Sequence, residues 1–98
     1  MSPPTDSTTT ETTSVNAVIC VSVVSHGHGQ QVIGLVEQLL RESSVGKLVL
    51  TLNIPEDLDL PSSERLVIVT NAQPKGFGAN HNAAFKQCEL PFYCVLNP

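Results

Sequence analysis

The stretch Ala17-Val-Ile-Cys-Val-Ser-Val-Val24 decides the fold of this 98-residue chain. It is a continuous apolar run, rich in β-branched residues, and such a run is typical of a strand that is buried on both faces. It ends at Ser25-His-Gly-His-Gly29, whose glycines favour a turn. A strand of this kind predicts a parallel sheet that is covered by helices.

The rest of the chain alternates helical and strand patterns. Apolar residues at spacings of three and four predict an amphipathic helix over residues 30–42, with Gly46 as its C-terminal stop. The further predicted elements are strands at 48–52, 66–69 and 92–96 and a second helix at 78–87. The link from 52 to 66 lacks a clear helical pattern, so it is expected to be a loop or one short turn. The predicted fold class is α/β, with a parallel sheet of about four strands, right-handed crossovers and flanking helices.

Composition limits the domain organisation and the partners. The Ser/Thr-rich residues 1–16 hold almost nothing apolar, which predicts a disordered tail, and residues 17–98 form one small domain. The net charge is −4 and the five Lys and Arg residues are scattered. Nucleic acid is not expected as a partner, because that function needs a clustered basic surface.

The cysteines and the apolar run predict the compartment. Cys20, Cys88 and Cys94 form no C-x-x-C pair and are odd in number, which favours free thiols in a reducing compartment. The apolar run is too short to span a bilayer, and its flanks are unlike those of a signal peptide. A cytoplasmic location is therefore expected.

Three polar segments follow the predicted strands: residues 25–29, 53–56 and 71–77. Ligands of parallel α/β sheets bind outside the carboxyl ends of the strands. We therefore expect the three segments to converge on one pocket. The size expected for its ligand is that of a nucleoside diphosphate.

Two motifs in the second half of the chain carry a family resemblance. Residues 76–80 read Gly-Phe-Gly-Ala-Asn, and the last strand runs into Val95-Leu-Asn-Pro98. Together with Val23-Val-Ser-His26 and the β-α-β order, they resemble the family 2 inverting glycosyltransferases of the GT-A type, in the rhamnosyltransferase-like branch. The resemblance covers residues 18–98 and implies a truncated, partial GT-A (Rossmann-like) sheet. Such a sheet is the donor-binding half of an enzyme that transfers a sugar from a dTDP- or UDP-linked donor.

The resemblance implies a base pocket at the ends of the first two strands. Ser25, His26 and Gly27 stand where the family lines that pocket. The family usually carries an aspartate at the end of the second strand, where the carboxylate accepts a hydrogen bond from the ring N–H. This chain departs from the pattern, and either Asn53 or Glu56 takes that role. The alternative for residues 53–56 is a simple turn with proline fixing one dihedral angle.

The resemblance assigns the diphosphate-sugar to the segment before the second helix. The residues implied there are Lys75, Gly76, Phe77, Gly78 and Asn80. Glycines allow close approach of the backbone, and a helix start directs free N–H groups at an anion. The structural alternatives are that Asn80 and Asn82 cap the helix, that Phe77 and Phe85 pack it onto the sheet, and that Lys75 is simply solvated.

Asn97 marks an incomplete metal motif. In the family a carboxylate follows Asn-Pro and binds the Mg²⁺ or Mn²⁺ that bridges the donor diphosphate. This chain lacks that carboxylate and the catalytic base, so no catalytic residue is assigned. We expect it to bind no metal and to be inactive alone. The parent would act on a glycan or lipid-linked acceptor, with peripheral membrane association through that acceptor.

Three other interpretations stay open at this point. His26 and His28, two residues apart, could bind a metal with His81 as a third ligand. The chain could be a non-catalytic nucleotide-binding or regulatory module of flavodoxin-like or receiver-like topology. It could also be a non-functional remnant, whose last strand is an exposed edge.

Overall fold

Strands and helices alternate along residues 17–98, which are the residues that the computed structural model describes. In chain order the elements are β2 (Ile19–Ser25), α2 (Gln30–Leu40), β3 (Val45–Leu52), β4 (Leu66–Thr70), α3 (Phe77–Phe85) and β5 (Phe92–Leu96). The predicted α/β class, the four strands and the two helices are confirmed. The predicted disordered tail, residues 1–16, lies outside the described residues.

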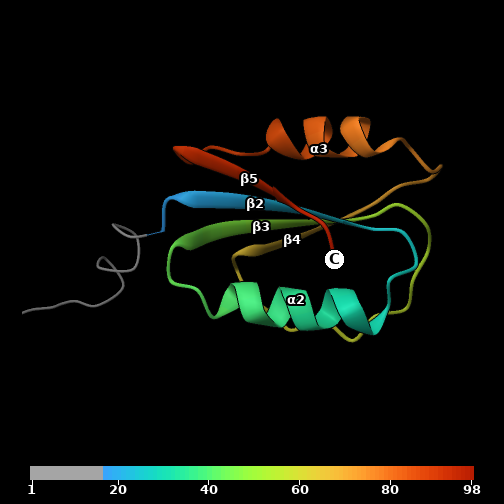
Figure 1. Ribbon diagram of the computed structural model, residues 1–98, viewed down its shortest axis with the longest axis horizontal. Helices are drawn as coiled ribbons and strands as arrows, with labels where there is room; N and C mark the ends of the chain where they lie inside the picture. The colour runs from blue at the N-terminus through green and yellow to red at the C-terminus, as the bar shows by residue number, and fades with distance from the viewer. Residues whose placement is uncertain (1–16) are drawn as a thin grey trace, which may run out of the picture.

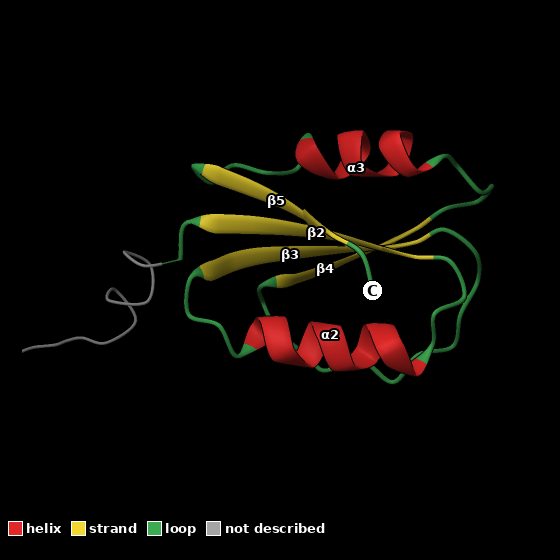
Figure 2. Cartoon of the chain, viewed as in Figure 1, coloured by secondary structure: helices red, strands yellow, loops and turns green. Residues whose placement is uncertain are grey.

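The four strands form one parallel sheet in the order β4-β3-β2-β5. β3 and then β4 follow β2 on one side of the sheet. The last strand, β5, lies on the other side of β2. Figures 1 and 2 show α2 below the sheet and α3 above it, so each face carries one helix. The strand order therefore reverses between β2 and β5.

Alternation along the strands divides the core into two layers. On the α2 side, Val32 and Val36 of the helix pack against Leu48 and Leu50 of β3. On the α3 side, Cys20, Val49 and Ala84 form a smaller buried cluster. Successive side chains of a strand point to opposite faces, so β2 and β3 supply both layers. This explains why β2 is buried along almost its whole length.

Gly46 does not stop the first helix, and that prediction is wrong. Helix α2 ends at Leu40, and Gly46 lies within β3. A Cβ atom at position 46 would lie only 2.6 Å from the carbonyl oxygen of Ala17. The glycine is therefore required by the close approach of two backbones, and a sequence pattern does not distinguish that cause from a helix stop.

The phenylalanines of α3 do not belong to the buried core, although the ring of Phe85 packs edge-on against Tyr93 of β5 with 5.1 Å between the ring centroids. Phe77 and Phe85 are each 56% exposed, while the buried residues of α3 are Asn80, His81 and Ala84. The reason is that the sheet offers a polar partner below the helix. Ser22 Oγ lies 2.7 Å from His81 Nδ1, and both residues are buried.

The strand order differs from the flavodoxin-like and receiver-like topology expected for one of the alternatives. In flavodoxin-like and receiver-like folds the third strand lies on the far side of the first strand from the second. Here the third described strand, β4, pairs with β3 instead.

The link between β3 and β4 contains no helix, in agreement with the predicted loop. Among the described residues, no helix combines the length and the apolar character that crossing a bilayer requires.

The two core layers give a first testable prediction. Leu50 and Ile68 are paired across β3 and β4, yet Leu50 is fully buried and Ile68 is 48% exposed. We expect Leu50→Ala to lower the free energy of unfolding by about 3 kcal/mol, because it leaves a cavity under α2. The control Ile68→Ala should lower it by about 1 kcal/mol or less. Urea denaturation measures both, and equal losses would contradict this assignment of the core.

Candidate functional site

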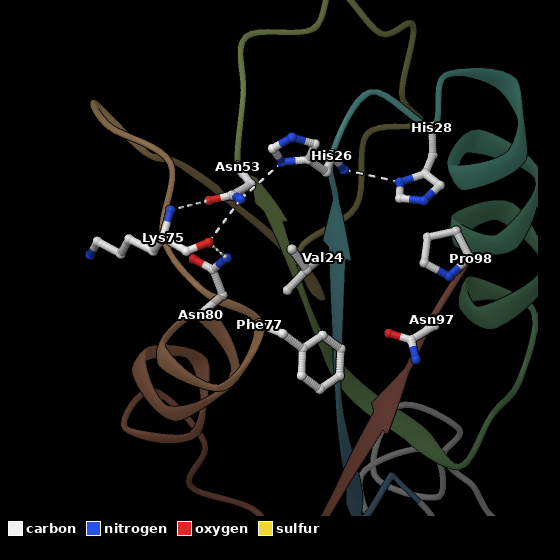
Figure 3. A pocket seen from close by; sticks show the side chains of 9 residues that line it. All are labelled: Val24, His26, His28, Asn53, Lys75, Phe77, Asn80, Asn97 and Pro98. Carbon is white, nitrogen blue, oxygen red and sulfur yellow. Dashed lines mark hydrogen bonds between the residues drawn. The ribbon is translucent and has the colours of Figure 1, made fainter.

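A cavity of about 370 Å³ lies at the carboxyl ends of the strands. Its lining comes from the ends of β2, β3 and β5 and from the start of α3: Val24, His26, His28, Asn53, Lys75, Phe77, Asn80, Asn97 and Pro98 (Figure 3). Open α/β sheets bind ligands where the strand order reverses, and that reversal falls here between β2 and β5. The volume of the cavity is at the lower end of the usual range for ligand pockets, about 300 to 1,000 Å³.

The carboxamide of Asn53 joins the walls of this cavity. Its Oδ1 accepts the backbone N–H of Lys75 at 2.8 Å, and its Nδ2 donates to the carbonyl oxygen of Lys75 at 3.0 Å. These two backbone partners fix which end of the amide is oxygen and which is nitrogen. The second hydrogen of Nδ2 points to Nδ1 of His26, 3.0 Å away. Asn53 therefore ties the end of β3 both to the loop before α3 and to the loop after β2.

Two further asparagines extend this contact. Asn71 donates from Nδ2 to Oδ1 of Asn53 at 2.9 Å and to Oδ1 of Asn80 at 2.7 Å. Asn53 and Asn80 are almost completely buried. Asn80 also donates from Nδ2 to the carbonyl oxygen of Lys75 at 3.4 Å. Asn80 is therefore no helix cap, because its side chain bonds to the preceding loop and the N-cap position belongs to Gly76.

The hydrogen bonds of the loop after β2 determine which ring nitrogen of its two histidines accepts a hydrogen bond. Nδ1 of His26 faces the N–H of Asn53, so it is an acceptor and the ring proton lies on Nε2. Nδ1 of His28 accepts the backbone N–H of His26 at 2.9 Å, so the proton of His28 also lies on Nε2. Each ring thus keeps an Nε2–H donor for a ligand or solvent.

Glu56 binds the same loop through its carboxylate. Its Oε2 accepts hydrogen bonds from Oγ of Ser25 at 2.5 Å and from the N–H of Gly27 at 2.9 Å, and its Oε1 accepts the N–H of Gly29 at 3.0 Å. Gly27 and Gly29 both have positive φ angles, which glycine adopts without strain. The carboxylate therefore lies between two N–H groups and one hydroxyl just before α2, where an anion is stabilised.

The pKa of Glu56 follows from these contacts. Partial burial opposes the charged form, but the hydrogen bonds from Ser25, Gly29 and Gly27 and the nearby His28 outweigh it. The pKa of Glu56 is therefore lowered, and the carboxylate is ionised at neutral pH. Because the loop N–H groups already bind this carboxylate, they are not free to bind a phosphate.

The structure brings many of the predicted residues to one place, but not all of them. Those that line the cavity are His26, Asn53, Lys75, Phe77, Asn80 and Asn97. Those that do not line it are Ser25, Gly27, Glu56, Gly76 and Gly78. The side chain of Lys75 extends away from the other lining residues, so this residue contributes its backbone (Figure 3).

Three contributors to the site received no individual role from the sequence, although Asn71 lies in the expected segment 71–77 and Pro98 in the quoted motif. Val24 and Pro98 line the cavity, and Asn71 supports it through Asn53 and Asn80. Val24 is the last residue of an apolar run, and nothing in the sequence marks it as a residue that lines a cavity. The position of Asn71 does indicate a place near the site, because a polar residue directly after a strand lies at the carboxyl edge of the sheet.

A divalent cation does not fit the donors of this cavity. Mg²⁺ and Mn²⁺ prefer oxygen ligands, carboxylates above all, and no carboxylate lines the cavity in the described part of the chain. Among residues 17–98, no group of three or more His, Cys, Asp and Glu side chains could hold a metal. His81 does not join His26 and His28, because its Nδ1 contacts Ser22 instead. Asn97 offers only a neutral carboxamide.

The cysteines provide no nucleophile near the cavity. Cys20, Cys88 and Cys94 are free thiols. Burial and the contact with Cys88 raise the pKa of Cys20 to about 12. This thiol is therefore protonated at neutral pH and has little reactivity.

Fold and site together define an α/β protein with a parallel, Rossmann-like sheet and a ligand cavity at the point where the strand order reverses. In comparisons with known proteins, no family model, no curated protein and no solved structure matched the chain.

Replacement of Asn53 by aspartate tests the asparagine contact. Asn53→Asp removes Nδ2 and places a carboxylate oxygen against the carbonyl oxygen of Lys75, so we expect a loss of about 3 kcal/mol in the free energy of unfolding at pH 7. The control Asn82→Asp makes the same chemical change at an exposed position of α3. It should change the stability by about 0.5 kcal/mol or less. Equal effects of the two variants would show that the Asn53 bonds contribute nothing.

The lowered pKa of Glu56 predicts a pH dependence. A carboxyl group with a lowered folded-state pKa stabilises the fold fully above its unfolded value, near pH 4.5, and loses that effect as the pH falls through the folded value. We expect Glu56→Gln to cost about 1 to 2 kcal/mol at pH 7. Denaturation at pH 3 to 7 should show this difference shrinking below about pH 4.5.

The control for this experiment is Asp57→Asn, which removes one negative charge from the exposed neighbour. It should leave the stability nearly unchanged at pH 7. A difference between wild type and Glu56→Gln that stays constant down to pH 3 would contradict the role given to the carboxylate.

Proposed function

We propose that this chain binds the nucleoside part of a nucleotide-diphosphate sugar, and that it represents the donor-binding part of an inverting GT-A glycosyltransferase of family 2. The observation that supports this most is the cavity itself. The ends of β2 and β3 and the start of α3 meet around one space at the reversal of strand order. Nucleotides bind at this position in related sheet topologies.

The chemistry of the lining suits a nucleoside. Val24, Phe77 and Pro98 give apolar surface for a flat ring, and His26 and His28 offer planar rings with fixed N–H donors. A uracil or thymine ring carries carbonyl oxygens that accept such hydrogen bonds. Asn53 does not take the family's aspartate role, because its oxygen and nitrogen already have partners within the chain.

The cavity supports binding and not turnover. A glycosyltransferase needs a base that removes the proton of the acceptor hydroxyl, and no carboxylate lines this cavity among the described residues. We therefore propose that the chain binds donor without transferring it. In the parent enzyme the acceptor would be a glycan or lipid-linked molecule at the membrane surface, and the location would be cytoplasmic.

Ligand-induced stabilisation tests this function. A ligand that binds only the folded chain raises its stability, by about 2.7 kcal/mol at a concentration 100 times the Kd. We expect millimolar dTDP and UDP to raise the Tm by several degrees, and ADP to raise it much less, because adenine lacks ring carbonyl oxygens. Thermal unfolding followed by circular dichroism measures the shifts. No shift with any nucleotide would reject the proposal.

A further inference from the structure

We infer that the nucleoside alone provides nearly all of the affinity at this cavity, and that neither a divalent cation nor a fixed positive charge holds the diphosphate. This inference rests on the proposed function and specifies how the same site selects its ligand. It differs from what the family resemblance implies, because there a metal ion bridges the donor diphosphate. Four features of the described residues support it.

The first feature is the charge of the lining. Lys75 is the one charged residue among the nine that line the cavity. Figure 3 shows its side chain directed away from the other lining residues, and the residue is exposed. Its contribution to the cavity is the backbone N–H and carbonyl that hold Asn53. No ammonium group is therefore positioned inside the cavity to bind a phosphate.

The second feature is the pair of N–H groups, from Gly27 and Gly29, just before α2. This is the position at which dinucleotide-binding sheets hold a pyrophosphate. Here the N–H groups of Gly27 and Gly29 and the hydroxyl of Ser25 all bind the carboxylate of Glu56. A phosphate would have to displace an ionised carboxylate that belongs to the chain itself, and its own charge would be repelled by it.

The third feature is the tautomer of the two histidines. A histidine binds a metal through a ring nitrogen that carries no proton. In His26 and His28 the unprotonated nitrogen is Nδ1, and it already accepts a hydrogen bond within the chain. The remaining Nε2–H groups are donors, so they can bind an oxygen atom of a ligand but cannot coordinate a cation.

The fourth feature is the lack of oxygen ligands for a metal. Oδ1 of Asn53 and Oδ1 of Asn80 accept hydrogen bonds from Asn71. Among the side-chain carbonyl oxygens of the described lining, this leaves the one of Asn97 for a metal. Mg²⁺ needs several oxygen ligands in near-octahedral geometry. A diphosphate therefore gains no bridge to this chain through the metal.

Titration calorimetry with three ligand conditions tests the inference on the full chain: thymidine with EDTA, dTDP with EDTA, and dTDP with Mg²⁺. We expect the three Kd values to agree within about threefold, because a charge-assisted phosphate contact is worth roughly tenfold or more. Tenfold tighter binding of dTDP with Mg²⁺ alone would overturn the inference in favour of a metal site. Tenfold tighter binding of dTDP in EDTA would overturn it in favour of a fixed cation.

A pair of variants identifies that cation if one exists. Lys75→Gln and Lys86→Gln each remove one positive charge from an exposed side chain, the first at the cavity and the second just after α3. The ratio of the dTDP and thymidine Kd values should be the same in both variants. A ratio that changes at least fivefold in Lys75→Gln alone would overturn the inference. If neither thymidine nor dTDP binds under any condition, the proposed function itself fails, which is a distinct result.

Discussion

The carboxamide of Asn53 is the contact on which the cavity depends. It is buried at the end of β3, and its two hydrogens and its oxygen all have partners on other segments. A buried amide left without partners would cost free energy, so these segments stay where the amide can reach them. One side chain thus fixes the loop after β2, the loop before α3 and the orientation of the His26 ring. Asn53 therefore positions the part of the cavity wall that these two loops form.

Much of the fold could be predicted from the sequence because apolar periodicity reports burial directly. The run at residues 17–24 and the spacing of Val32 and Val36 placed a buried strand and a helix correctly. The errors have a different cause. The usual roles of glycine and phenylalanine predict a helix stop at Gly46 and a core position for Phe85. The structure instead uses Gly46 for a close backbone approach and places Phe85 at the surface, beside Tyr93.

The candidate site was harder to predict than the fold. That three loops meet follows from parallel topology, since the carboxyl ends of parallel strands share one edge. Which side chains face the cavity does not follow. Glu56 and Ser25 looked like ligand-binding residues, but they bind each other across 31 positions of sequence. Asn71, Asn53 and Asn80 form a contact whose members become neighbours only after the sheet has formed.

Polar contacts between α3 and the sheet position the cavity wall that Phe77 forms. His81 is 5% exposed and its Nδ1 contacts Ser22 of β2, while its backbone carbonyl accepts the hydroxyl of Tyr93 from β5 at 2.7 Å. Burial lowers the pKa of His81, so the ring is neutral at neutral pH. An aliphatic residue at position 81 would leave Ser22 without its buried partner. The helix is thus fixed over β2 and β5 by polar contacts with defined geometry. Phe77, one turn earlier and 4.4 Å from the His81 ring centroid, is thereby held at the cavity wall.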